Sequence, residues 1–344
     1  MPDYEDLVSL VRGAIPEKPL PCFYDFAPCH AGVAGGIPNL TRYYLDVDEK
    51  IRVQMELKER LPEALILPGV FPDLGVVAEV SAFGGQIHWF DDGAPYIAPA
   101  FKDIKEVDSL KPPKPGRTGL TAPLLIQQEI MIRKLNAQGK ALEKWVLTMG
   151  PAEIAGLLLG YDKYYYAFYD DPKRVTTLME MVTEFVIKWI RRQGEAFGGA
   201  DVIMIADHVC SQVTIEQLEE FILPFEKEIY ASFPDALKIY HNEGFHSDRH
   251  IELVLGFGAD LWHFGSDVHS LPDLYSKIGD KIVPFGGLSP HGVIRTGTPE
   301  EVYSETRKVV EAAKGRRLLL SSGTGTTPDT HLANVRAMVR AALA

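Results

Sequence analysis

From about residue 120 to the C-terminus, two patterns of apolar residues alternate along the chain. Short, nearly continuous apolar runs are typical of buried strands, and longer segments with an apolar residue every three or four positions predict helices. The expected strands cover residues 143–151, 200–209, 237–244, 259–265, 281–290 and 317–325. The expected helices cover residues 122–139, 152–169, 170–199, 214–233, 247–258, 271–279, 298–313 and 329–344. This alternation predicts the α/β class, with a parallel sheet closed as a (β/α)8 TIM barrel at this chain length.

The segment before residue 60 follows neither pattern for long. Helices are expected over residues 2–15 and 46–62, the second ending at a proline. Between them, residues 21–45 are aromatic and rich in glycine, which predicts a loop that either covers the core or forms a wall of a substrate site. We therefore expect residues 1–60 to be a helical and loop extension over the barrel.

Residues 60–120 connect this extension to the regular part. Two β-prone runs, 76–83 and 86–90, predict strands. The charged, proline-rich segment 102–119 is too short to separate two domains. A single domain over residues 1–344 is the expected organisation.

Composition sets the broad class of protein. With 46% hydrophobic and 10% aromatic residues in 344, the chain can bury a full core. The most apolar stretch, residues 145–161, is interrupted by Glu153, so no membrane span is expected. The N-terminus has no basic region followed by an apolar core, so we expect no signal peptide and a cytoplasmic enzyme.

Charge and cysteine content exclude several kinds of partner and cross-link. The net charge is −12, with dispersed Lys and Arg, which argues against nucleic acid and anionic membranes as partners. Three cysteines, Cys22, Cys29 and Cys210, are too few for a disulfide framework. We interpret them as buried or incidental thiols rather than a zinc clip.

Imidazoles and carboxylates follow three of the predicted strands. His241 and Glu243 stand two residues apart, so both would face one side if the strand continues that far. His263 lies near the end of the next strand, and Asp207 with His208 ends the preceding one. In parallel α/β architectures, sites are built at this edge of the sheet. The convergence predicts a metal or acid–base centre.

Each of these residues alone would be read as a hydrogen-bonded loop residue. Together, His241 and Glu243 are the expected first metal ligands and His263 the third. Asp207 would be either a fourth ligand or a partner that fixes a histidine tautomer. His208 and Glu228 are lesser candidates.

Several segments in order resemble one superfamily. They are GPAEIAGLLLGYDKYYYAFYDDP, GGADVIMIADHVCS, FILPFEKEI, HNEG, GADLWHFG, IVPFGGLSP, RTGTPEEV and LLLSSGTGTTPDTHLANVRAMV. Together they resemble the uroporphyrinogen decarboxylase superfamily, over roughly residues 60–344. The resemblance implies a (β/α)8 barrel, and either a decarboxylase or a corrinoid-dependent methyltransferase that uses zinc.

The departures from the superfamily's patterns decide between these activities. Decarboxylases carry an N-terminal motif of the type RQAGRY for the substrate carboxylates, whereas this chain has CFYDFAPCHAGVAGG, with only Arg12 before Arg42. Such a site would leave substrate charges unpaired, which argues against decarboxylation of uroporphyrinogen.

The methyltransferases that act on coenzyme M are expected to bind zinc through a His-x-Cys pair and a late Cys in an SSGCG-type loop. This chain has His241-Asn242-Glu243 and Thr324 at those places, so both sulfurs are missing. Imidazole and carboxylate make a harder zinc centre, which suits an oxygen ligand better than a thiol.

The resemblance therefore implies a zinc-dependent methyltransferase of the O-demethylase type. It would transfer a methyl group from a methoxylated, aromatic substrate to the Co(I) corrinoid (cobalamin) of a partner protein, with Asp207, His241 and Glu243 as catalytic residues. The aromatic residues expected to line the substrate are Phe23, Tyr24, Phe26, Trp89 and Phe90, together with His208. Two alternatives stay open: a methylcorrinoid-to-thiol methyltransferase, and a metal-free lyase. A homodimer is also compatible with the sequence.

Overall fold

Strands and helices alternate in the computed structural model as the apolar pattern predicts, over the residues it describes: 2–24, 33, 35–37 and 39–344. The chain divides into two units. The first contains Met1–Val70, Ile239–Phe245 and Asp260–Ala344, and the second contains Phe71–Lys238 and His246–Ala259. Each unit has its own parallel strands, described in turn below.

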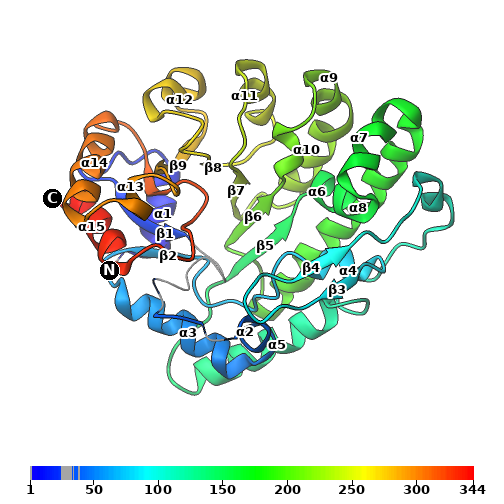
Figure 1. Cartoon of the computed structure of the whole chain (residues 1–344), viewed down its shortest axis with the longest axis horizontal. Coiled ribbons are helices and arrows are strands. Elements are labelled where there is room, and N and C mark those ends of the chain that lie inside the picture. The colour runs from blue at the N-terminus through cyan, green and yellow to red at the C-terminus, as the bar shows by residue number, and fades with distance from the viewer. Residues whose placement is uncertain (1, 25–32, 34, 38) are drawn as a thin grey trace. The chain divides into compact units, whose positions relative to one another are not determined.

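The first unit is built on six neighbouring parallel strands (Figure 1). Their order is β2 (Leu65–Leu67), β1 (Leu20–Tyr24), β10 (Leu319–Ser322), β9 (Val283–Leu288), β8 (Leu261–Phe264) and β7 (Leu237–Asn242). The strands are short apolar runs because both faces of the sheet are covered. In the register, His241 pairs with His263, and His263 pairs with Phe285. This row across β7, β8 and β9 is the start of the candidate site.

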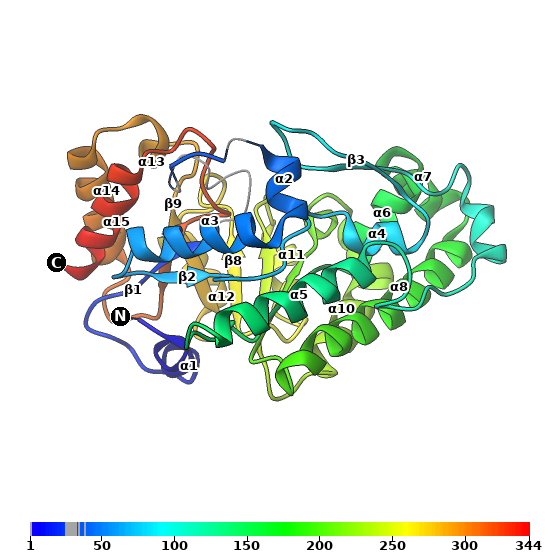
Figure 2. The ribbon, with the colours of Figure 1, turned by 90° about the horizontal axis from the view of Figure 1, so that it is seen from below.

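Helices cover these strands from the outside. They are α1 (Tyr4–Val11), α2 (Leu40–Leu45), α3 (Val47–Arg60), α12 (Leu271–Ile278), α13 (Val293–Thr296), α14 (Pro299–Ala312) and α15 (Leu332–Leu343). Helices α14 and α15 pack against each other, and they cover β9 and β1 (Figure 1). Helix α3 runs beside the strand that follows it, β2 (Figure 2).

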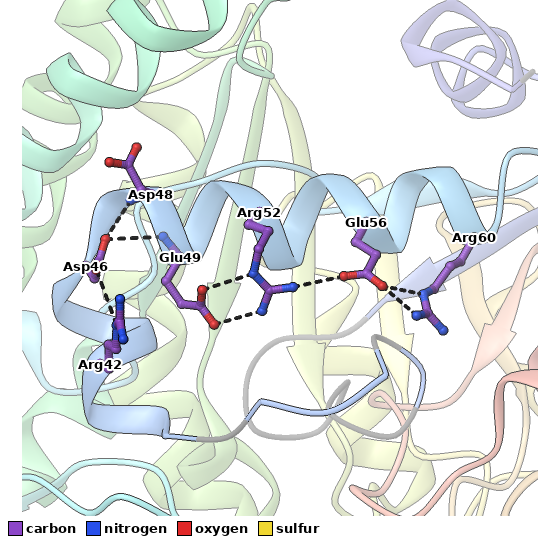
Figure 3. A network of polar contacts seen from close by, with 7 residues as sticks. All are labelled: Arg42, Asp46, Asp48, Glu49, Arg52, Glu56 and Arg60. Atoms are coloured by element: carbon purple, nitrogen blue, oxygen red, sulfur yellow. Dashed lines mark hydrogen bonds and ion pairs between the residues drawn. The ribbon is translucent and has the colours of Figure 1, made fainter.

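The outer face of α3 carries a row of ion pairs (Figure 3). Asp46 caps the helix by accepting hydrogen bonds from the backbone N–H groups of Asp48 and Glu49. Arg52 pairs with Glu49 at 2.8 Å and with Glu56 at 3.0 Å, and Glu56 also pairs with Arg60. Such exposed pairs contribute only about 0.3–0.5 kcal/mol each. The burial of the opposite face holds the helix in place.

The second unit contains a parallel pair and a small antiparallel pair of strands. Strands β5 (Trp145–Met149) and β6 (Val202–Ala206) are parallel, and β3 (Gln86–His88) and β4 (Tyr96–Ala98) are antiparallel. The α-helices are α4 (Ala78–Ala82), α5 (Thr121–Asn136), α6 (Pro151–Leu159), α7 (Tyr161–Asp170), α8 (Pro172–Gly194), α9 (Ile215–Gln217), α10 (Leu223–Ala231) and α11 (Asp248–Val254). The 3-10 helices η2 (Ile104–Ser109), η3 (Glu195–Phe197) and η4 (His208–Ser211), and a π-helical turn, η5 (Leu218–Ile222), complete it.

Helix α8 shows how the sequence determines the long helices of this unit. Asp171 caps it through its side chain, and Pro172 occupies the first turn, where no N–H is needed. It packs against β5 and α10, and Figure 2 shows it beside α10. The helix expected over 170–199 is therefore confirmed, with its end at Gly194.

Two secondary-structure predictions are wrong. Residues 76–83, expected as a strand, form helix α4, because the buried polar side chains of Glu79 and Ser81 find partners on other elements there. The predicted loop over 21–45 begins as strand β1, whose burial pattern is nearly continuous. Cys22, Phe23 and Tyr24 of this strand are core positions, which composition alone could not distinguish from a covering loop.

Glu79 is a buried acid whose removal we expect to stabilise the fold. It accepts hydrogen bonds from Thr148 Oγ1 at 2.9 Å and from Trp189 Nε1 at 3.1 Å. Burial raises the pKa of Glu79 above its usual value, and the hydrogen bonds oppose this only in part. Because the folded state holds the proton more tightly, stability present below pH ~4.5 is lost as pH rises through the folded pKa.

We therefore expect Glu79→Gln to raise the free energy of unfolding at pH 7 by about 1 kcal/mol. The amide oxygen keeps both hydrogen bonds without burying a charge. Urea unfolding at pH 4, 5, 6 and 7 should show the gain growing with pH, while Glu79→Ala should lose stability throughout. A gain that does not change with pH would contradict this account.

Among the described residues, no helix is both long enough and apolar enough to cross a membrane.

Candidate metal centre

Two histidines stand side by side at the ends of β7 and β8. His241 and His263 are register partners on parallel strands, so their side chains point to the same side of the sheet. Their Nδ1 atoms lie 2.8 Å apart, and both side chains are buried. The structure brings together two of the three predicted ligands.

The second ring nitrogen of His263 is also engaged. Its Nε2 atom accepts a hydrogen bond from the Thr324 N–H at 2.8 Å and lies 3.3 Å from the carbonyl oxygen of Ser322. Burial lowers the pKa of His263 to about 3, so the ring is neutral at physiological pH. A neutral imidazole has one donor and one acceptor nitrogen.

Two proton arrangements are open to this pair. If Nε2 of His263 accepts from Thr324, the His263 proton is on Nδ1 and is donated to His241. If the His263 proton is on Nε2 instead, it faces the Ser322 carbonyl, and His241 becomes the donor within the pair. Nε2 of His241 then carries a lone pair, as a metal ligand requires. His263 is thus placed to set the tautomer of His241.

Aromatic rings surround the histidine pair. The ring of Phe285 stacks on His263 with centroids 4.0 Å apart, and Tyr24 meets His263 edge-on at 4.5 Å. Tyr24 also lies 5.4 Å from the ring of His241. Because Phe285 and Tyr24 are almost fully buried, they hold the imidazoles in place and keep water from them.

Glu243 reaches the pair from beyond the strand. Strand β7 ends at Asn242, one residue before Glu243, so strand alternation does not determine the side to which Glu243 points. Its carboxylate nevertheless lies near His241, with Oε2 3.8 Å from Nε2, and the Glu243 side chain is 49% exposed. A close approach fixes its backbone: a Cβ at Gly265 would lie 2.0 Å from the Glu243 carbonyl oxygen.

The atoms of His241 and Glu243 fit a zinc ion. Zinc binds imidazole nitrogen and carboxylate oxygen at about 2.0–2.2 Å, so one ion between Nε2 and Oε2 can reach both across their separation. Both ring nitrogens of His263 contact other protein atoms, so we expect His263 to orient His241 rather than to bind the metal itself. The loop at Thr324 adds a backbone donor and no sulfur. Thr324 has a positive φ of 79°, unusual for a β-branched residue.

In the second unit, Asp207 and Glu153 interlock two chain segments. Asp207 Oδ2 accepts from the N–H groups of Ala152 (2.9 Å) and Glu153 (3.2 Å) at the start of α6. In return, Glu153 Oε2 accepts from the backbone N–H of His208 at 3.0 Å. A Cβ at Gly150 would lie 2.3 Å from Asp207 Oδ2, so only glycine permits this approach.

Glu153 also orients two side chains. Its Oε2 lies 3.3 Å from Nδ1 of His208, and its Oε1 accepts a hydrogen bond from the Tyr161 hydroxyl. Burial acts to raise the pKa of Glu153, but the hydrogen bond and charge of His208 outweigh it, and the net pKa is lowered. His208 is held as in a carboxylate–histidine pair, a common support for ligands and bases.

Comparison with known proteins places the chain in a family. The model of the family described as uroporphyrinogen decarboxylase (URO-D) matches residues 42–344. The chain belongs to the uroporphyrinogen decarboxylase family. This confirms the resemblance drawn from the sequence.

Relatives of this family member include methyltransferases. It is 24% identical to the methylated-thiol–coenzyme M methyltransferase of Methanosarcina mazei over 277 residues, 78% of this chain and 71% of that protein. It is 26% identical to the methylcobamide:CoM methyltransferase MtbA of the same organism over 275 residues, 78% of this chain and 77% of that one.

A solved structure titled "methyltransferase from Methanosarcina mazei" matches this family member with a TM-score of 0.79 at 19% identity. The match covers 98% of this chain and 96% of that one. At this identity the likeness establishes the fold. The predicted (β/α)8 barrel of the uroporphyrinogen decarboxylase type is confirmed.

The other residues that the sequence singled out differ in how far they are buried. Phe23 is fully buried in β1, Trp89 follows β3 half-buried, and the ring of Phe90 is 45% exposed. Phe26 lies outside the described residues, as does Cys29. Cys22 and Cys210 are buried and form no disulfide.

Sequence reasoning chose Glu228 and missed Glu226. Glu228 is exposed, whereas Glu226 is fully buried within α10. The helical spacing could have shown that Glu226 is buried, because it lies four residues from both Ile222 and Tyr230, which are core residues. The role of Glu153 had no such signal, since its partner His208 is 55 residues away.

Proposed function

We propose that this family member is a zinc-dependent methyltransferase of the O-demethylase type. Its reaction moves a methyl group from a methoxylated, aromatic substrate to the Co(I) corrinoid of a partner protein. The observation that carries the proposal is the pair formed by His241 Nε2 and Glu243 Oε2, 3.8 Å apart, with no sulfur atom between or beside them in the motif.

His241 and Glu243 would hold the zinc. When bound, zinc supplies Lewis-acid stabilisation of the negative charge that develops on the departing oxygen. When His263 accepts the Nδ1 proton of His241, Nε2 of His241 has the lone pair that a metal ligand requires. Tyr24 and Phe285 exclude water and fix the two rings. Asp207 and His208 remain predicted contributors, as do Trp89 and Phe23 for the substrate.

Two relatives of the chain support methyl transfer and a corrinoid partner. One relative acts on methylated thiols and coenzyme M, and another takes a methylcobamide. Atoms balance in the proposed step: the methyl–oxygen bond breaks, the oxygen keeps the electron pair, and the methyl carbon bonds to cobalt(I). The oxygen substrate follows from ligand hardness, because carboxylate and imidazole favour oxygen where thiolates favour sulfur.

A donor screen tests the proposal. The full-length chain, loaded with zinc, would be mixed with cob(I)alamin and one methyl donor at a time: a methoxyphenol, a methylamine or a methylated thiol. Formation of methylcobalamin is followed by absorbance. We expect turnover with the methoxyphenol, at a rate at least about tenfold above the others, equivalent to roughly 1.4 kcal/mol of discrimination.

The alternatives predict other results. Turnover with the methylated thiol alone would establish the thiol methyltransferase that the relatives' names suggest. Release of carbon dioxide from uroporphyrinogen, without zinc, would establish a lyase. Either outcome would contradict the O-demethylase proposal.

A further inference from the structure

A second group of metal-ligating side chains lies within the second unit. It consists of Asp207 after β6, Cys210 in η4 and Glu226 in α10. One ligand atom from each lies within 4.8 Å of those of the other two, and all three residues are 0% exposed. Ligand atoms on one zinc ion lie roughly 3.2–3.8 Å apart, so small movements would bring these three onto one ion.

Glu226 is the observation that demands an explanation. Both of its carboxylate oxygens are buried, and no N–H group of the described residues donates a hydrogen bond to either. A buried carboxylate without donors is costly, so a position in the middle of the buried face of α10 would favour an apolar residue. An acid stands there beside another acid and a thiol, and a cation between them would balance their charge.

The charges around Glu226 come mainly from Asp207. Burial, and then the charge of Asp207, raise the pKa of Glu226. Burial and the charge of Glu153 raise the pKa of Asp207 to about 7, although two N–H groups of α6 oppose this. The N–H groups at the start of α6 thus stabilise Oδ2 of Asp207. They do not balance the charge of Glu226.

We propose that Asp207, Cys210 and Glu226 form a structural site for a divalent cation of the zinc class. The thiol selects this class, because a thiolate with carboxylates suits zinc and disfavours magnesium or calcium. The ion ties the segment after β6, which also carries His208, to α10. The π-helical turn η5, directly before α10, shifts the helical register at this point, as such turns often do at functional sites.

Metal content of the full-length chain gives the first test. After loading with Zn²⁺ and removal of excess, Glu226→Gln should hold about one zinc fewer per chain than the wild type. Glutamine keeps the size of the side chain and removes the charge. The double variant His241→Ala/Glu243→Ala removes the ligands of the other centre. Zinc lost from the His241–Glu243 pair is therefore counted separately from zinc lost from the Asp207–Cys210–Glu226 site.

Cobalt substitution gives a readout specific to Cys210. With Co²⁺ in place of zinc, a thiolate ligand produces a charge-transfer band in the near ultraviolet, which the sulfur-free His241–Glu243 pair cannot produce. We expect the band in the wild type and its loss in Cys210→Ser. Cys22→Ser is the matched control, because Cys22 is also 0% exposed; it should keep the band, as should Cys29→Ser and His241→Ala/Glu243→Ala.

A wild type without the band, or a band that survives Cys210→Ser, would overturn the site. A zinc content in Glu226→Gln equal to that of the wild type would also overturn the site. Asp207 and Glu226 would then share a proton instead of a metal ion. Circular dichroism checks that each variant folds, and if Glu226→Gln does not, the band in Cys210→Ser decides. Because the band does not depend on methyl transfer, failure of the proposed function leaves this test intact.

Discussion

Replacing His241 by alanine should abolish methyl transfer while leaving the fold intact. The variant loses the imidazole nitrogen that faces Glu243, and with it the metal whose charge stabilisation is worth several kcal/mol. The expected fall in the rate constant for methyl transfer is therefore about a thousandfold or more. Zinc content and methylcobalamin formation, measured on the same preparation, check both parts.

His331→Ala is a matched control, since its exposed side chain makes no capping bond to α15. It should keep both zinc and activity. His263→Ala should lie between the two, with metal affinity lowered roughly 10–100-fold, because it removes the partner of His241 and no ligand. Full activity in His241→Ala would remove this residue from the proposed centre.

Gly265→Ala is expected to have the second-largest effect, because it displaces Glu243 without changing any ligand. The new Cβ would lie 2.0 Å from the Glu243 carbonyl oxygen and 2.8 Å from its carbonyl carbon. Both are backbone atoms, so no change of rotamer relieves the contact. We expect a loss of roughly 3 kcal/mol in the free energy of unfolding, measured in urea, together with weaker zinc binding.

Gly93→Ala controls for the loss of glycine itself. Its nearest neighbour would be Phe90 Cβ at 3.7 Å, an ordinary contact, so the free energy of unfolding should change little. If Gly265→Ala is as stable as Gly93→Ala and binds zinc equally well, the close approach of the two chain segments does not position Glu243.

Local pattern was sufficient for most of the elements. The apolar runs at Trp145–Met149 and Val202–Ala206, and the Asp171–Pro172 start of α8, are signals that neighbouring residues carry by themselves. The pattern failed at 76–83, where β-branched valines suggested a strand. There the partners of Glu79, which are 69 and 110 residues away, favour a helix.

For the site, the sequence by itself determined which side chains stand at the ends of the strands. It placed His241 and His263 at the ends of successive parallel strands, and strand periodicity is a local property of the backbone. It also has Glu243 where the resemblance to coenzyme M methyltransferases implies a cysteine.

Only the tertiary structure decided what each group does. The Thr324 N–H, 61 residues from His263 along the chain, contacts the second ring nitrogen of His263, and no local pattern signals this contact. Glu226 and Asp207 lie close together in the buried interior, although each looks ordinary in sequence. Hydrogen bonding and desolvation depend on which atoms lie within a few ångströms, and the packing of distant segments sets those distances.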